Sequence, residues 1–132
     1  MGRKSKRVSW DSAPDIKRRI LHLVKKAEIN WLQASRIFTY RSYGSKTRAY
    51  ARTWGLPSLW QRALDVTPAY IIEVISEHFD KLSEVDRDKV LLHEIMHIPK
   101  NFSGALTPHI RRGKRNFHRK VEELISVYLR NK

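Results

Sequence analysis

His93-Glu94-Ile95-Met96-His97 is an HExxH pentapeptide, and it lies in a run of residues with the apolar pattern of a helix. Residues four apart lie on the same face of a helix, so His93 and His97 can direct two imidazoles at one Zn²⁺. Glu94 is turned by about 100° from His93, and its carboxylate can flank the metal without ligating it. This arrangement is typical of zinc-dependent peptidases. The alternative is a helix whose two histidines only pack or face solvent.

Signals for both ends of this helix flank the motif. Ser83 predicts the N-cap, with Asp86 three residues further on. Acidic residues in the first turns complement the helix dipole, and they are Glu84, Asp86 and Asp88. Pro99 disfavours helical geometry in the residue before it and is expected to end the helix just past His97. The motif is therefore expected in the last two turns of a buried helix.

The composition indicates one small domain whose metal ligands must be nitrogen or oxygen atoms. The chain has 132 residues, of which 41% are apolar, and this is enough to form a core. It has no cysteine, which excludes a disulfide framework and a thiolate zinc site. No apolar run approaches the roughly 20 residues that span a membrane. The basic N-terminus lacks the apolar segment of a secretory signal, so we expect a cytoplasmic protein.

The charge balance is strongly basic. The chain carries 27 Lys and Arg against 13 Asp and Glu, a formal net charge of +14. Such a field attracts polyanions, so non-specific nucleic-acid binding is expected. The segment from Arg41 to Arg52 also interleaves basic residues with Tyr43 and Tyr50. An ordinary solvated strand edge explains this segment equally well, and a charged surface can also serve solubility.

The rest of the pattern predicts a single α+β domain, with residues 1–9 as a flexible basic tail and residues 10–132 as the domain. The expected elements are a helix from Ser12 to Asn30, a strand over 34–43, a second strand over 48–54 that pairs with it, a short helix over 58–64, a strand over 69–75, and a last helix over 119–129. Because Glu73 lies in the middle of the strand over 69–75, one face of that strand is expected to be partly wet. His78 is expected to be structural or exposed.

A catalytic zinc ion requires a third protein ligand, and four candidate residues follow the motif. His109 follows a loop that is constrained by Gly104 and Pro108, and we favour it because such a loop can fold back under the helix. The alternatives are His118, just before the last helix, and the two glutamates on that helix, Glu122 and Glu123.

At these residues the chain resembles the small metallopeptidases of archaea and phages, which have a zincin-like fold. The resemblance covers about half of the chain and rests on the order of several blocks: Arg48–Arg52, Trp54–Pro57, Leu59–Gln61, Pro68–Tyr70, Phe79–Leu82, His93–Pro99, Phe102–Gly104 and Pro108-His109. It implies zinc ligation by His93 and His97, Glu94 as the catalyst and His109 as the third ligand. Lys100 stands where a metzincin has a glycine, so the chain is not of that type.

The predicted function is hydrolysis of peptide bonds in a peptide or protein substrate. Glu94 would act as the general base toward a zinc-activated water, as in other HExxH enzymes. The alternative is a basic nucleic-acid-binding domain with a structural metal or none. The sequence specifies neither the substrate nor the oligomeric state.

Overall fold

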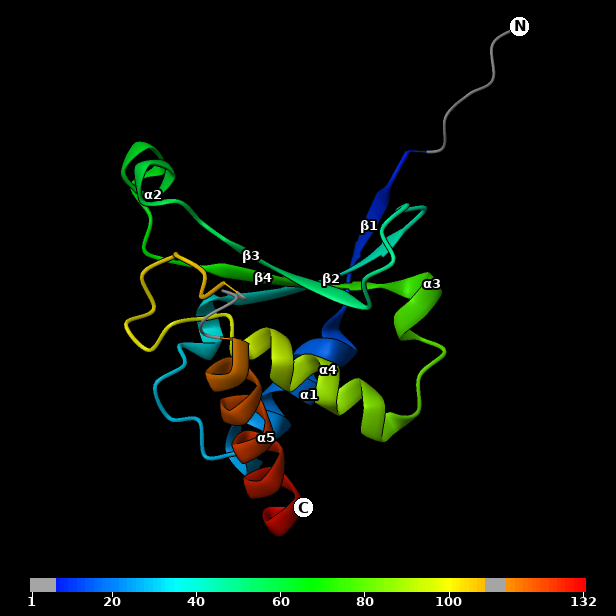
Figure 1. The fold of residues 1–132 in the computed structure, drawn as a ribbon. Coiled ribbons are helices and arrows are strands. Elements are labelled where there is room, and N and C mark those ends of the chain that lie inside the picture. Colours follow the sequence, from blue (N-terminus) through cyan, green and yellow to red (C-terminus); the bar gives the residue numbers. More distant parts are fainter. Residues whose placement is uncertain (1–6, 109–113) are drawn as a thin grey trace, which may run out of the picture.

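The computed structural model describes residues 7–108 and 114–132, which form a mixed four-stranded sheet with the longer helices packed against one face (Figure 1). The strands are β1 (Ser9–Ser12), β2 (Ile37–Tyr43), β3 (Ala51–Gly55) and β4 (Tyr70–Ile75). The helices are α1 (Pro14–Lys26), α2 (Ser58–Leu64), α3 (Ser76–Phe79), α4 (Glu84–Ile95) and α5 (Lys114–Asn131), with a short 3₁₀ turn at Ala34–Arg36. The predicted α+β class is confirmed, including the C-terminal helix.

The sheet has the strand order β1-β2-β4-β3. β4 runs parallel to β2 and antiparallel to β3, while β1 is antiparallel to β2. The expected pairing of residues 48–54 with residues 34–43 is therefore wrong, because β4 lies between these two strands. β4 is the most apolar strand and is buried over most of its length. A strand of that kind is favoured in the centre of a sheet, where both of its edges are paired.

Several predicted boundaries differ from the observed ones. β2 begins at Ile37, because the preceding residues form the 3₁₀ turn. The connection expected after β4 contains α3, and α5 begins at Lys114, five residues before the expected start. The strand β1 was not predicted, and its first residue, Ser9, had been assigned to the basic tail. Residues 1–6 of that tail lie outside the described residues.

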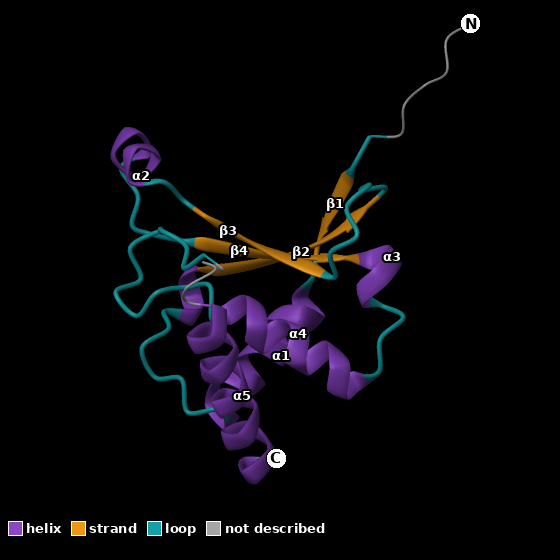
Figure 2. Cartoon of the chain, in the orientation of Figure 1, coloured by secondary structure: helices purple, strands orange, loops and turns teal. Residues whose placement is uncertain are grey.

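The helices α1, α4 and α5 lie together on one side of the sheet (Figure 2). The core lies between these helices and the sheet. Its most deeply buried side chains have exposed fractions of 1% or less: Ile20, Leu23, Ile37, Ile72, Leu91 and Leu92. Arg19 of α1 donates two hydrogen bonds to Asp88 of α4, at 2.7 and 2.6 Å. Tyr128 of α5 donates to the same carboxylate at 2.8 Å. One buried carboxylate thus joins all three helices.

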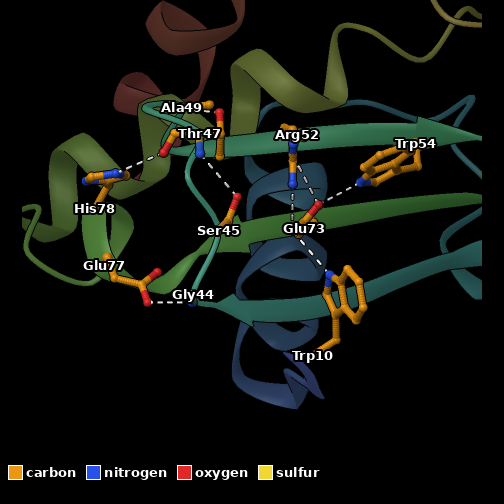
Figure 3. A network of polar contacts seen from close by, with 10 residues as sticks. All are labelled: Trp10, Gly44, Ser45, Thr47, Ala49, Arg52, Trp54, Glu73, Glu77 and His78. Carbon is orange, nitrogen blue, oxygen red and sulfur yellow. Dashed lines mark hydrogen bonds and ion pairs between the residues drawn. The ribbon is translucent and has the colours of Figure 1, made fainter. Parts of the chain in front are cut away.

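The opposite face of the sheet carries a second buried carboxylate, Glu73, which was expected to be partly wet. Its exposed fraction is only 1%. Arg52 donates to it at 3.2 and 3.1 Å, and the indole N–H groups of Trp54 and Trp10 donate at 2.7 and 3.3 Å (Figure 3). These three side chains cover the carboxylate and satisfy it. The expectation was wrong because a mid-strand charge can be buried when neighbouring strands supply a cation and ring donors.

We expect the Glu73→Gln variant to be less stable than the parent protein at neutral pH. Burial acts to raise the pKa of Glu73, but the hydrogen bonds from Arg52 and Trp54 outweigh it, and the pKa lies below the usual 4.5. Because Arg52 would lose its partner, the expected loss at pH 7 is about 2–4 kcal/mol of unfolding free energy. Urea denaturation followed by circular dichroism measures it.

The pH dependence supplies the control for this variant. A carboxylate whose pKa is lowered by folding stabilises the protein fully above its unfolded pKa, and this contribution is lost as the pH falls through the lower folded value. The difference between the parent protein and Glu73→Gln should therefore shrink below a pH of about 4.5. A difference that stays constant into acid would show that the charge of Glu73 does not contribute.

Candidate metal centre

The first three residues of the HExxH motif, His93 to Ile95, lie in α4, and the last one, His97, lies just beyond it. The predicted N-cap is confirmed, because the side chain of Ser83 accepts a hydrogen bond from the N–H of Asp86 at 3.2 Å. The helix ends at Ile95, and His97 lies in the turn that follows, with its N–H donating to the carbonyl of Glu94 at 3.1 Å. The motif does not occupy two full helical turns. The tightened turn nevertheless keeps the two histidines on the same side.

His93, Glu94 and His97 form a cluster of possible metal ligands. One ligand atom from each residue lies within 4.8 Å of the others. The two imidazole rings have their centroids 5.1 Å apart and are inclined at 75°. Two ligands of one zinc ion can be about 4 Å apart at most, because each bond is about 2.0–2.1 Å long. The spacing therefore suits a shared ion after only a small adjustment of the side chains.

The orientation of the His97 ring is fixed by the loop that follows the motif. Its Nδ1 lies 2.6 Å from the carbonyl oxygen of Thr107. A carbonyl oxygen only accepts hydrogen bonds, so Nδ1 carries the proton and Nε2 keeps its lone pair. The N–H of Thr107 donates in return to the carbonyl of His97 at 2.7 Å. A backbone acceptor of this kind is the usual partner that orients a metal-binding histidine.

The loop from Ile98 to Pro108 is itself fastened to the sheet. The hydroxyl of Tyr70 accepts from the N–H of Gly104 and donates to the carbonyl of Ala105, both at 2.7 Å. Gly55 at the end of β3 lies directly against this loop, and a Cβ atom there would come within 2.1 Å of the Gly104 carbonyl oxygen. The position of His97 therefore depends on β3 and β4 as well as on α4. The sequence alone did not indicate these contacts.

Glu94 is largely buried, with an exposed fraction of 7%. Thr53 of β3 donates from its hydroxyl to Oε1 of Glu94 at 2.8 Å and lies 3.0 Å from the backbone carbonyl of the same residue. Burial raises the pKa of Glu94 to about 7, and the hydrogen bond from Thr53 acts in the opposite direction. Thr53 was not predicted as a site residue. The alternation of β3 could have indicated it, because Thr53 lies on the face opposite to Arg52 and Trp54.

A cavity of about 500 Å³ opens beside the cluster. His93 and Glu94 line it from α4, Tyr50 from the residue before β3, and Glu122 and Ile125 from α5. It gives the cluster a solvent-accessible side that a substrate could reach. A binding cleft of this kind is mostly apolar with a few convergent polar groups.

The candidates for the third ligand fall in different places. Glu122 lines the cavity that His93 and Glu94 share, whereas Glu123 lines a separate cavity near Met96. His109 lies outside the described residues, and so does the side chain of His118. Of the other histidines, His78 contacts the Thr47 carbonyl at 3.1 Å, which agrees with its expected structural role.

The residues of this cluster fit a divalent cation. Zinc accepts imidazole ligands when thiolates are absent, and the adjacent carboxylate of Glu94 adds a negative charge that favours a cation. The tautomer of His97 leaves Nε2 as its coordinating atom, and the ring is already held by Thr107. The site is therefore of the class that binds a metal through a histidine pair with an adjacent carboxylate.

A comparison with protein families agrees with this class. The model of the family described as "Putative phage metallopeptidase" matches residues 8–126, and the chain belongs to this family. The predicted resemblance is thereby confirmed. A peptidase family implies a peptide or protein substrate, and a metallopeptidase implies a metal ion. Neither the curated proteins nor the solved structures gave a match. Among the described residues, no helix has the length and apolar character needed to cross a membrane.

The hydrogen bond between Thr53 and Glu94 can be tested through stability. We expect Thr53→Val, which keeps the shape and removes the hydroxyl, to lower the unfolding free energy by about 1–2 kcal/mol, because a buried carboxylate loses a donor. Thr53→Ser keeps the hydroxyl and should lose less. Equal stability of the valine variant and the parent protein, measured by urea denaturation, would contradict the assigned role of this bond.

Proposed function

We propose that the protein is a zinc-dependent metallopeptidase in which His93, His97 and His109 hold the metal and Glu94 is the general base. The observation that carries this proposal is the cluster of His93, Glu94 and His97, whose ligand atoms lie within 4.8 Å of one another beside an open cavity. Membership of a metallopeptidase family supports it independently.

The chemistry is divided between the metal and Glu94. A zinc ion held by imidazoles supplies Lewis acidity, which favours deprotonation of a water and stabilises the negative charge that develops on a carbonyl oxygen. Glu94 would take the proton of the attacking water and deliver it to the leaving amine nitrogen. The hydroxyl of Thr53 holds Oε1 of this carboxylate, so Oε2 is the oxygen that we assign to proton transfer.

Burial favours this role for Glu94. A carboxylate with a pKa near neutrality is a better base than one in water, because its conjugate acid holds the proton more strongly. The pKa of Glu94 is raised to about 7 by burial. A nearby cation would lower this value again. The two effects together would keep the group ionised and still able to exchange a proton.

For the third ligand we keep His109 as the proposal and Glu122 as its alternative. Thr107 is held against His97 by two hydrogen bonds, and His109 follows Thr107 by two residues in the sequence. Glu122 is supported by the cavity that it lines together with His93 and Glu94. Imidazole and carboxylate both serve as third ligands in zinc enzymes.

The Glu94→Gln variant tests the proposed base. It is expected to bind one equivalent of zinc as the parent protein does, and to lose at least about a hundredfold in peptide hydrolysis, because general acid–base catalysis contributes this much or more. Zinc content by atomic absorption and cleavage of a fluorogenic peptide library measure the two properties. Glu123→Gln, on the same helix as Glu122 but in a different cavity, is the matched control.

Two outcomes of this experiment would contradict the proposal. Purified protein that takes up no divalent ion at a stoichiometric level would exclude a metal enzyme. A Glu94→Gln variant that hydrolyses peptides as fast as the parent protein would exclude Glu94 as the base. Zinc bound without any hydrolysis in either protein would favour the alternative, a nucleic-acid-binding domain with a structural metal.

The third ligand can be assigned by comparing His109→Ala with Glu122→Gln. The variant that removes a ligand should weaken zinc affinity by more than the 10–100-fold that loss of an outer-shell partner costs. Competition with a chromogenic chelator measures this affinity. His118→Ala is measured with them as the remaining histidine candidate, and His78→Ala, whose ring contacts the Thr47 carbonyl, serves as the control. Unchanged affinity in His109→Ala, together with weakened affinity in Glu122→Gln, would transfer the assignment to Glu122.

A further inference from the structure

The face of the sheet that points away from α1, α4 and α5 carries a group of exposed aromatic side chains. The members, with their exposed fractions, are Trp10 (56%), Phe38 (44%), Tyr40 (36%) and Trp54 (50%). They come from β1, β2 and β3, and Ile71 of the central strand β4 is exposed between them. We call this surface the outer face. A contiguous group of exposed apolar side chains can mark a binding surface.

The register of the strands arranges these side chains in rows. Phe38 pairs with Ile71, and Ile71 pairs with Trp54, so the three lie side by side across β2, β4 and β3. In the next row, Tyr40 is opposite Glu73, and Glu73 is opposite Arg52. Because side chains two apart on a strand lie on the same face, both rows belong to the outer face.

The two indole rings are held in place rather than free to rotate. Trp54 donates its N–H to Oε1 of Glu73, and Trp10 donates its N–H to Oε2 (Figure 3). The bonds fix the polar edge of each ring and leave ring surface open to solvent. Two rings fixed in this way form a pre-organised platform, which binds a flat ligand with little loss of side-chain freedom.

Two guanidinium groups accompany the rings. Arg52 lies with its guanidinium carbon 5.3 Å from the centre of the Trp54 ring, and Arg36 lies 5.8 Å from that of Phe38. Glu73 is the acidic side chain in these rows, and Arg52 neutralises it. The charges of Glu73 and Arg52 cancel, so the charge of Arg36 makes these rows positive. The chain as a whole has a net charge of +14. A polyanion is therefore attracted to this face.

We propose that the outer face binds single-stranded nucleic acid, with bases stacked on the aromatic rings and phosphates attracted by the basic chain. Stacking platforms beside positive charge are the general means by which proteins hold single strands, since every base has an aromatic face. A duplex keeps its bases stacked on one another and can use only the charge. A second copy of this chain fits less well, because two strongly positive chains repel each other.

This surface is separate from the metal centre. Thr53 of β3 contacts Glu94 on the helix side, while its neighbours Arg52 and Trp54 lie on the outer face. The inference therefore does not depend on peptidase activity. Glu94→Gln should bind an oligonucleotide as tightly as the parent protein.

The test is fluorescence anisotropy with labelled oligonucleotides of about 15 nucleotides, the upper range of single-strand sites. The probes are oligo-dT, oligo-U and a DNA duplex of the same length. Trp54→Ala and Phe38→Ala should each weaken binding to the single strands by about 5–100-fold, the effect of losing one stacked base. Their duplex affinity and the slope of affinity against salt should not change, because the phosphate contacts remain.

Two control variants accompany these measurements. Trp54→Phe keeps a ring at this position and should retain most of the affinity. Leu129→Ala removes an equally exposed apolar side chain from α5 and should have no effect. Circular dichroism of every variant checks that the fold is intact. If Trp54→Ala and Phe38→Ala lose affinity for both oligo-dT and oligo-U, the face recognises the bases and not the sugar. If they lose affinity for only one of the two, the proposal is also supported, and the preferred polymer is identified.

Three results would overturn the proposal. One is single-strand affinity in Trp54→Ala and Phe38→Ala equal to that of Leu129→Ala. Another is equal affinity of the parent protein for the single strand and the duplex, which would indicate charge alone. The last is a parent protein that is dimeric by light scattering and becomes monomeric on Phe38→Ala, which would make the outer face an interface between copies.

Discussion

The hydroxyl of Thr53 joins the sheet to the helix that carries the metal motif, and the geometry of the site depends on this contact. It donates to the side chain of Glu94 and also lies within hydrogen-bonding distance of its backbone carbonyl. At the end of the same strand, Gly55 allows the loop behind His97 to approach closely. β3 therefore positions both the carboxylate and one imidazole, although it contains no residue of the HExxH motif.

Three buried acidic side chains show how differently the fold treats negative charge. Asp88 is paired with Arg19 and accepts a hydrogen bond from Tyr128, and Glu73 is paired with Arg52 and accepts from two indoles. In both cases a guanidinium offsets the cost of burial. Among the described residues, no lysine or arginine forms an ion pair with Glu94, and its pKa is raised. Glu94 is also the carboxylate that lies beside the two histidines. A cation bound by these histidines would offset the cost of burying the charge of Glu94.

The sequence predicted the parts of this structure that depend on local patterns. The N-cap of α4, the apolar periodicity of α1 and α4, the β-branched β4 and the HExxH pair were all readable from spacing. The ends of α1 were not, because the helix runs from Pro14 to Lys26 and Ser12 belongs to β1. The strand order could not be predicted from spacing, because the pairing of β3 with β4 depends on which strand is the most deeply buried in the folded sheet. The burial of Glu73 was missed for the same reason, since Arg52 and the two tryptophans that cover it come from other strands. For Thr53, only the alternation of β3 indicates the face on which it lies, and its contact with Glu94 depends on the packing of α4 against the sheet. Thr107 reaches the site through loop closure, which leaves no local signature.

Three of the four tryptophans, at positions 10, 54 and 60, have exposed fractions of 56%, 50% and 58%, and two of them share one carboxylate. Intrinsic emission of this protein is therefore dominated by indoles at the surface and not by indoles in the core. Quenching by iodide would therefore report mainly on the surroundings of Glu73 and α2. The fourth tryptophan, Trp31, is partly buried and lines a cavity together with Met96 and Thr107. Iodide thus separates the tryptophans at the surface from the one near the loop that follows the histidine pair.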